Sequence, residues 1–175
     1  MDSLVVTVIG PDRPGLVSLL AGRGKAHGAS WEESRMASLA GQFAGIVRFE
    51  VPVAQAAALT AALRELESLG LQVVVAAGIG GAPRGGVRVL KLELVGQDRP
   101  GIIRDISRVL AELGISIQEL TTELSSAAMS GEHMFNAEAL LNVPADVTTA
   151  ALSAVLEALA NELMVDVTLD EAKAS

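Results

Sequence analysis

The sequence predicts an α+β protein that consists of two tandem βαββαβ modules, each a four-stranded antiparallel sheet with two helices on one face. Three observations lead to this prediction. A turn motif occurs twice, as GPDRPG at residues 10–15 and as GQDRPG at residues 96–101. The apolar residues after each turn show the same succession of helix and strand periods. A glycine-rich stretch at residues 78–87 separates the two copies and is typical of a linker.

The correspondence between the copies continues beyond the turn and indicates an internal duplication. The second copy is longer than the first between its second and third strands, where a β-hairpin tolerates extra residues. The equivalent positions are Gly28 and Gly114, Ser30 and Ser116, Glu33 and Glu119, and the pairs Val51-Pro52 and Val143-Pro144.

The first strand and first helix are clearest in the second copy. Leucines alternate with charged residues over residues 90–94, the period of a strand with one buried face. Apolar residues then recur at helical spacing over residues 102–113, and Gly114 follows at the position where glycine often ends a helix. The matching helix of the first copy contains Gly22 and Gly24, each of which costs about 1 kcal/mol relative to alanine in a helix interior. We therefore expect that helix to be locally loose.

The rest of each copy predicts two strands, a helix and a final strand. In the second copy the two strands cover residues 115–124 and 135–143, the helix includes residues 152–159, and alternation over residues 163–169 predicts the last strand. Right-handed crossovers give the strand order 4-1-3-2, which is the ferredoxin-like arrangement. The expected boundaries are 1–77 for the first module, 78–87 for the linker, 88–170 for the second module and 171–175 for a C-terminal tail.

Composition argues against several classes of function. The chain has 175 residues, 21 acidic and 13 basic residues, a net charge of -8 and no cysteine. A negative surface repels a phosphate backbone, so we expect no direct nucleic-acid binding. Without cysteine there is no disulfide framework or thiolate cluster, and the two histidines show no metal-site spacing, so no metal or cofactor is expected. No apolar run approaches the roughly 20 residues of a membrane span, so we expect no membrane contact and a cytoplasmic location.

The turn after each first strand is the candidate binding site. Its proline is expected in the first turn of a helix, where a missing N–H costs nothing, and its aspartate is expected to cap that helix. The amides of the next two residues would then point outward at the positive end of the helix dipole, which favours a carboxylate. A turn with a purely structural role explains the same pattern equally well. The residues concerned are Asp12, Pro14, Gly15 and Leu16, and their equivalents Asp98, Pro100, Gly101 and Ile102.

The repeated turn, the Gly-x-Ser that opens each second strand and the βαββαβ order resemble the ACT domain family of amino-acid sensors. Residues 33–44 and 130–139 resemble, more narrowly, the tandem-ACT group of glycine cleavage system transcriptional repressors. The resemblance covers nearly the whole chain. It implies a non-enzymatic regulatory protein that binds glycine or another small amino acid and acts through a partner protein, in transcriptional control of glycine cleavage.

The resemblance also implies where the ligand lies. In that family the effector is held between two modules, by the first-turn amides of one and the start of the second strand of the other. Ala29 and Ile115 stand where many family members have asparagine, a departure that affects the second half of each pocket. The residues nominated in this way are Asp12, Arg13, Pro14, Gly15 and Leu16 with Ser116 and Ile117, and Asp98, Arg99, Pro100, Gly101 and Ile102 with Ser30 and Trp31.

Other interpretations remain open from the sequence. Arg13 and Arg99 are able to pair with a ligand carboxylate in bidentate fashion, or to bridge the modules. Small ferredoxin-like hydrolases of the acylphosphatase kind share the fold, but they place an asparagine beside their arginine, which this sequence lacks. A regulatory scaffold without a ligand is a further alternative. The second and fourth strands of each module are unpaired edges, so we expect side-by-side pairing into an eight-stranded sheet and a homo-oligomer.

Overall fold

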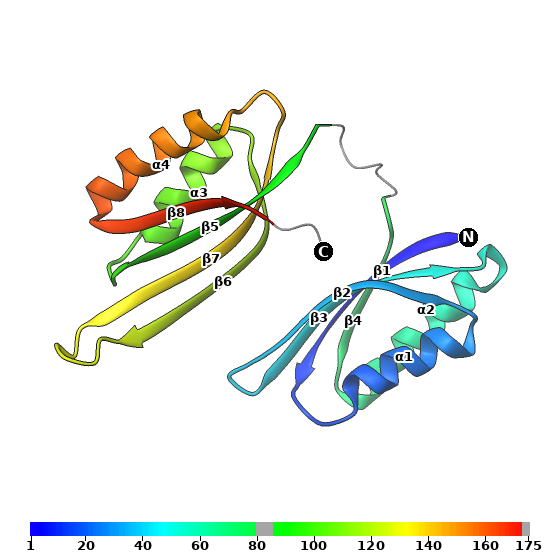
Figure 1. The fold of residues 1–175 in the computed structure, drawn as a ribbon. Helices are drawn as coiled ribbons and strands as arrows, with labels where there is room; N and C mark the ends of the chain where they lie inside the picture. The colour runs from blue at the N-terminus through cyan, green and yellow to red at the C-terminus, as the bar shows by residue number, and fades with distance from the viewer. Residues whose placement is uncertain (80–85, 173–175) are drawn as a thin grey trace. The chain divides into compact units, whose positions relative to one another are not determined.

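The computed structural model describes residues 1–79 and 86–172. The chain divides into two compact units, Met1–Gly81 and Ala82–Ser175, which we call unit 1 and unit 2. Most of the predicted linker, at residues 80–85, and the end of the predicted tail, at residues 173–175, lie outside the described residues. Each unit contains the strands and helices expected of one copy of the repeat (Figure 1).

The elements follow the predicted order in both units. Unit 1 comprises β1 (Asp2–Pro11), α1 (Leu16–Ala26), β2 (Ser30–Leu39), β3 (Gln42–Val51), a 3-10 turn (Val53–Gln55), α2 (Ala56–Arg64), a second 3-10 turn (Glu65–Leu69) and β4 (Gln72–Ala77). Unit 2 comprises β5 (Arg88–Gln97), α3 (Ile102–Glu112), β6 (Ser116–Ser126), β7 (His133–Val143), α4 (Thr149–Leu163) and β8 (Val165–Glu171).

Each unit has a single antiparallel sheet in the described part of the chain. The strand orders are β2-β3-β1-β4 and β6-β7-β5-β8, so the edges are β2 and β4 in unit 1 and β6 and β8 in unit 2. Both helices of a unit lie on the same face of its sheet (Figure 1). The predicted fold class and strand order are confirmed.

One element boundary was wrongly predicted. The alternation of apolar residues places Leu163 in the last strand, but Leu163 is the final residue of α4. Met164 follows with a φ of 54°, a left-handed conformation that turns the chain into β8 at Val165. The helix stripe and the strand alternation overlap at Leu163, so its apolar character fits either period. At its other end β8 continues to Glu171, the first residue of the predicted tail.

Each unit buries its own apolar core between the helices and one sheet face. The two cores are separate clusters, and alternate residues of the central strands supply their centres, as in the fully buried Val6 of β1 and the nearly buried Leu90 and Leu94 of β5. No polar or charged side chain is buried among the described residues. Apolar burial stabilises a fold by about 25 cal/mol per Å² removed from water. Each unit therefore has its own source of stability.

The cores of the two units differ at one packed position. In unit 1 the rings of Trp31 and Phe49 meet edge to face, with centroids 5.3 Å apart. A Cβ on Gly24 of α1 would lie 2.6 Å from Phe49 Cε1, a distance that real Cβ contacts do not show. Gly24 thus makes room for the Phe49 ring, and α1 continues through it as an unbroken helix. The equivalent residues of unit 2 are Leu110 in place of Gly24, Ile117 in place of Trp31 and Leu141 in place of Phe49.

The small residue Gly24 beside the large residue Phe49, where unit 2 has two leucines, suggests a test of stability. Gly24→Leu should lower the free energy of unfolding by about 1–3 kcal/mol because the new side chain overlaps the Phe49 ring. Adding Phe49→Leu, which copies the pair found in unit 2, should recover part of that loss, so the two changes should be non-additive. Urea denaturation of both single variants and the double variant measures this. Gly22→Ala is the control, since Gly22 has no atom near its Cβ position and the change should gain up to about 1 kcal/mol. Strict additivity would contradict the packing account.

Candidate functional site

The two repeated turns have the same backbone geometry. Gly15 precedes α1 with a φ of 92°, and Gly101 precedes α3 with a φ of 93°. This left-handed region favours glycine, because a Cβ there approaches the neighbouring backbone. The repeat is therefore a repeat of conformation as well as of sequence. It accounts for a glycine at each position without reference to a ligand.

The predicted capping of these helices is wrong. The residues that cap α1 and α3 are the two glycines, and no side chain caps either helix in the described structure. Pro14 and Pro100 lie before the glycines and so outside the first helical turn. Asp12 instead accepts a hydrogen bond at Oδ2 from Ser38 Oγ of β2, at 2.7 Å, so its carboxylate is engaged with the β2–β3 hairpin rather than with the helix end.

Each turn is also tied to a hairpin through its backbone. The amide of Asp12 donates to the carbonyl of Gly41 at 2.9 Å, and the amide of Asp98 donates to the carbonyl of His133 at 2.9 Å. Gly41 and His133 belong to the hairpins that join the second and third strands of each unit. The aspartate at each turn therefore has a structural role in placing the turn.

The surroundings of the two glycines differ. A Cβ on Gly15 would meet no atom within 4 Å, so that turn is open. A Cβ on Gly101 would lie 3.5 Å from Arg104 Nη2 and 3.9 Å from Asp105 Oδ2. These two side chains form an ion pair with a 3.0 Å separation on the first turn of α3. The Asp105 carboxylate therefore lies near the positive end of its own helix, where a negative charge is favourable.

The two arginines of the turns also differ. Arg13 donates from Nη2 to the carbonyl of Leu69 at 3.1 Å, an exposed contact within unit 1. A guanidinium has five N–H donors, so this bond leaves others for a ligand or a neighbouring module. Arg99 is half-buried and has no comparable bond within the described residues. Both predicted roles of these arginines, pairing with a ligand carboxylate and bridging two modules, are compatible with this geometry.

At the starts of the second strands, only the serines face outward. Ser30 pairs with Glu50 on the sheet face away from the helices, and Ser116 pairs with Asn142, whose Nδ2 donates to Ser116 Oγ at 3.4 Å. Trp31 and Ile117 are half-buried and pack against the cores of their units. Their side chains belong to the helix–sheet interior, so any role in a pocket at the surface would fall to their backbones.

Within one unit, the first turn and the start of the second strand lie at opposite ends of one helix. Helix α1 has 11 residues, which at about 1.5 Å per residue separates Gly15 from the start of β2 by roughly 16 Å. Unit 2 has the same arrangement, with α3 between Gly101 and Ser116. A single unit therefore does not bring a first turn and a second-strand start together. Only two units, from one chain or from two, are able to complete such a pocket.

Two family models match the chain, and both describe the ACT domain, one over residues 2–76 and the other over residues 91–135. The chain belongs to the ACT domain family. The paired glycine turns are thus the first turns of two tandem ACT modules. No protein with a curated function matches this tandem ACT chain.

Solved structures support the tandem arrangement over the full length. A protein from Galdieria sulphuraria, described only as an unknown protein, is 30% identical, with a TM-score of 0.82 over 98% of this chain and 99% of that chain. A candidate glycine cleavage system transcriptional repressor is 18% identical, with a TM-score of 0.73 over 99% of this chain and 98% of that chain. The second likeness shows the ACT fold alone.

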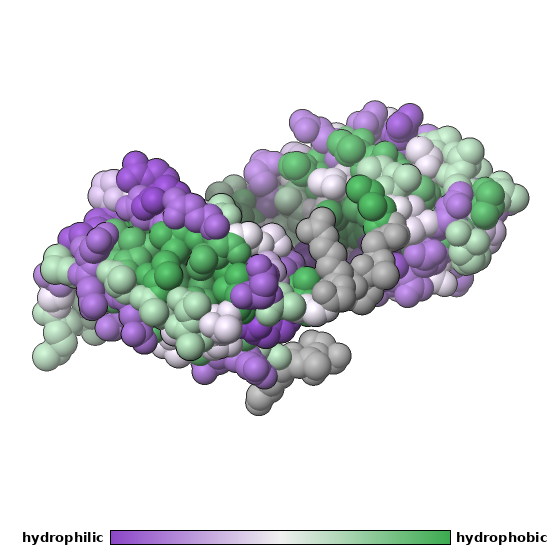
Figure 2. Space-filling model, turned by 90° about the horizontal axis from the view of Figure 1, so that it is seen from above, coloured by the Kyte–Doolittle hydropathy of each residue, from purple (hydrophilic) through white to green (hydrophobic). Residues whose placement is uncertain are grey.

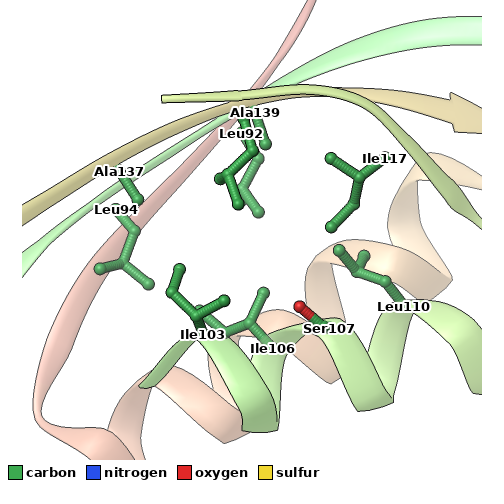
Figure 3. A pocket seen from close by; sticks show the side chains of 10 residues that line it. Leu92, Leu94, Ile103, Ile106, Ser107, Leu110, Ile117, Ala137 and Ala139 are labelled. Carbon is green, nitrogen blue, oxygen red and sulfur yellow. The ribbon is translucent and has the colours of Figure 1, made fainter. Parts of the chain in front are cut away.

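An apolar cavity of about 20 Å³ lies inside the second ACT module, between α3 and the sheet (Figure 3). Its lining is aliphatic apart from Ser107, and includes Leu92, Ile103 and Ile117. It has room for about one water molecule. An amino acid carries two charges, which are costly to bury without polar partners. This cavity is therefore no site for a free amino acid.

The described residues, 1–79 and 86–172, contain no group of histidine and carboxylate side chains placed to hold a metal ion. Nor do they contain a helix long and apolar enough to cross a membrane.

The conformation of the first turn yields a prediction about stability. Gly15→Ala should destabilise unit 1 by about 1–2 kcal/mol because of the left-handed backbone, and Gly15→Asn should cost less because asparagine tolerates that region. No packing clash contributes, since the Cβ position is open. Denaturation of the two variants beside wild type measures the difference. Equal losses for alanine and asparagine would show that the backbone conformation is not the cause.

Proposed function

We propose that this tandem ACT protein is a non-enzymatic sensor that binds a small amino acid, glycine or a close relative, and regulates a partner protein. The observation that supports this proposal is the uncapped helix N-terminus at each repeated turn, with an exposed Gly15 at the first. Uncapped first-turn amides at the positive end of a helix are suited to a carboxylate. Every free amino acid carries one.

The second half of the pocket belongs to another module. Since α1 separates Gly15 from Ser30, we infer that the effector lies where the first turn of one module meets the start of the second strand of another. Ser30 or Ser116 would then supply a hydroxyl to the ligand, and the backbones at Trp31 and Ile117 would line the site.

Binding between modules provides the regulatory step. A ligand shifts only those equilibria whose states it binds unequally, and a pocket shared by two modules exists only while they are paired. Occupancy would therefore stabilise the paired state. A partner protein that recognises one arrangement of the modules would report the change.

The two first turns are expected to contribute unequally. The turn at Gly15 is open, whereas the turn at Gly101 lies beside the Asp105 carboxylate, which already occupies the neighbourhood of the helix end. A ligand carboxylate at Gly101 would have to compete with the Asp105 carboxylate, both for the positive helix end and for Arg104, which is already paired with Asp105. We therefore propose that the turn of unit 1 is the stronger carboxylate site, with Arg13, Pro14 and Leu16 around it.

The setting that we propose is transcriptional control of glycine cleavage, exerted through another protein. The name of the candidate repressor with the same tandem fold supports this setting. The net charge of -8 argues against direct contact with a nucleic acid. A protein partner would then carry the signal to the transcription machinery.

A screen of the common amino acids by thermal shift tests the sensing function. A ligand that binds only the native state raises stability by RT ln(1 + [L]/Kd), so an effector at about 100 Kd should add roughly 2.7 kcal/mol. We expect a selective shift with glycine or another small amino acid, and calorimetry should then give a saturable isotherm. If no amino acid changes the unfolding temperature, sensing is wrong and the ligand-free scaffold takes its place.

Substitutions at the two glycines test the site separately from the function. Gly15→Asn should weaken effector binding at least roughly tenfold, because the added side chain would occupy the open space beside the first-turn amides and charge-assisted hydrogen bonds contribute about 1.5–3 kcal/mol. Gly101→Asn should have a smaller effect. Calorimetry on each folded variant gives the dissociation constants. Gly131→Asn is the matched control, because Gly131 also has a positive φ and an open Cβ position but lies in the β6–β7 hairpin. Unchanged affinity in both turn variants would refute the site and leave sensing intact.

A further inference from the structure

The helices of unit 1 cover one face of its sheet, and the other face is largely apolar. We call this second surface the open face of unit 1. Three rows of side chains cross it on β3, β1 and β4, as the strand registers place them. Ile46, Ile9 and Val74 are 45%, 44% and 64% exposed, and they lie on the three neighbouring strands β3, β1 and β4. The rows are Ala44, Ile9 and Gln72; Ile46, Thr7 and Val74; and Arg48, Val5 and Ala76.

The charges on this open face are balanced. Arg48 Nη1 lies 3.1 Å from Glu50 Oε1, and Arg35 Nη2 lies 3.3 Å from Glu33 Oε1. These pairs flank the apolar rows toward β2, where Glu33 and Arg35 pair with Arg48 and Ile46 of β3. The face is therefore electrically neutral on a chain whose net charge is -8.

The corresponding open face of unit 2 has the opposite character. Its cation Lys91 lies 2.8 Å from Glu93 and 3.7 Å from Glu138. The hydrogen bond with Glu93, together with the charges of both carboxylates, raises the pKa of Lys91 and keeps it protonated. The register places further carboxylates on the same face, which is strongly negative as a result. They are Glu119, Glu123, Asp166 and Asp170.

We propose that the open face of unit 1 is a dimerisation surface that packs against the same face of a second copy of this chain. A neutral apolar face is able to meet itself in a two-fold interface without repulsion between like net charges. The open face of unit 2 would repel its own copy. It would also lose the hydration of its carboxylates against an apolar partner, which is costly. Apolar residues at the surface of both units can be seen in Figure 2.

The area of the open face of unit 1 is sufficient for such a dimer. Strand β1 has 10 residues, and four strands span a face of roughly 33 Å by 19 Å at the usual spacings, or about 600 Å² per copy. Two copies would bury about 1,200 Å², the lower end of the range for specific interfaces. Sheets that pack face to face in this way lie about 10 Å apart. A dimer of moderate, concentration-dependent affinity is expected.

The duplication supplies substitutions that the fold already accepts. Glu138 of unit 2 occupies the position equivalent to Ile46. Ile46→Glu therefore places a charge at the centre of the proposed interface, at an exposed strand position where the other copy of the repeat already has glutamate. Lys91 is equivalent to Val5, which makes Val5→Lys a second variant of the same kind. The reverse change in unit 2, Glu138→Ile, is the control because it lies outside the proposed interface.

Sedimentation equilibrium of the full chain over a range of concentrations tests the proposal. Wild type should associate as concentration rises, and Ile46→Glu and Val5→Lys should each have half the mass of wild type at the highest concentration, with unchanged circular dichroism. Glu138→Ile should still dimerise like wild type. If wild type keeps the mass of one chain throughout, or if both unit 1 variants keep the wild-type mass, the proposed interface is wrong. Association through edge strands alone would give this second result.

Discussion

Two helices pack on one face of a four-stranded sheet in each unit, and most other properties of the chain follow from this packing. The helices bury the alternate residues of the central strands, so each unit obtains a separate core. They also leave the opposite sheet face and two edge strands without a partner. A single βαββαβ unit therefore has a complete apolar core, but its own helices leave one sheet face and two edge strands uncovered. The proposed dimerisation surface is the sheet face that the helices of unit 1 do not cover.

The helix that covers the sheet also separates the parts of the proposed ligand site. The chain leaves β1 through a glycine turn, returns along α1 and only then enters β2, so the amides and the serine lie at opposite ends of the unit. Under the proposal made above, the second-strand start of another unit, in the same chain or in a second copy, would have to supply the other half of the site. The same need for two units makes the site sensitive to how the units pair, which a sensor requires.

The sequence predicted the fold well because its signals are local and repeated. The period-2 alternation at residues 90–94 and the helical spacing at 102–113 each depend only on neighbouring residues. Capping by Asp12 could not be predicted reliably, because the aspartate bonds to Ser38 across the hairpin, and the helix begins at a left-handed glycine. The role of Gly24 could not be predicted either, because the residue that requires a glycine there is Phe49, which is distant in sequence. Comparison of the two copies would have indicated it, because the pair Gly24 and Phe49 of unit 1 is replaced by the pair Leu110 and Leu141 in unit 2.

The tie between each first turn and its hairpin has a consequence for how a signal could leave the site. The amide of Asp12 donates to the carbonyl of Gly41 in the β2–β3 turn, and that of Asp98 to the carbonyl of His133 at the start of β7, so each first turn is hydrogen-bonded to a hairpin. One strand of each hairpin is a sheet edge, β2 or β6. A ligand that immobilises the turn would also reduce the motion of that edge, and ordering at one site lowers the entropic cost of ordering at another. Occupancy of the turn would thus also act on an exposed edge strand, in addition to its proposed effect on the pairing of the modules.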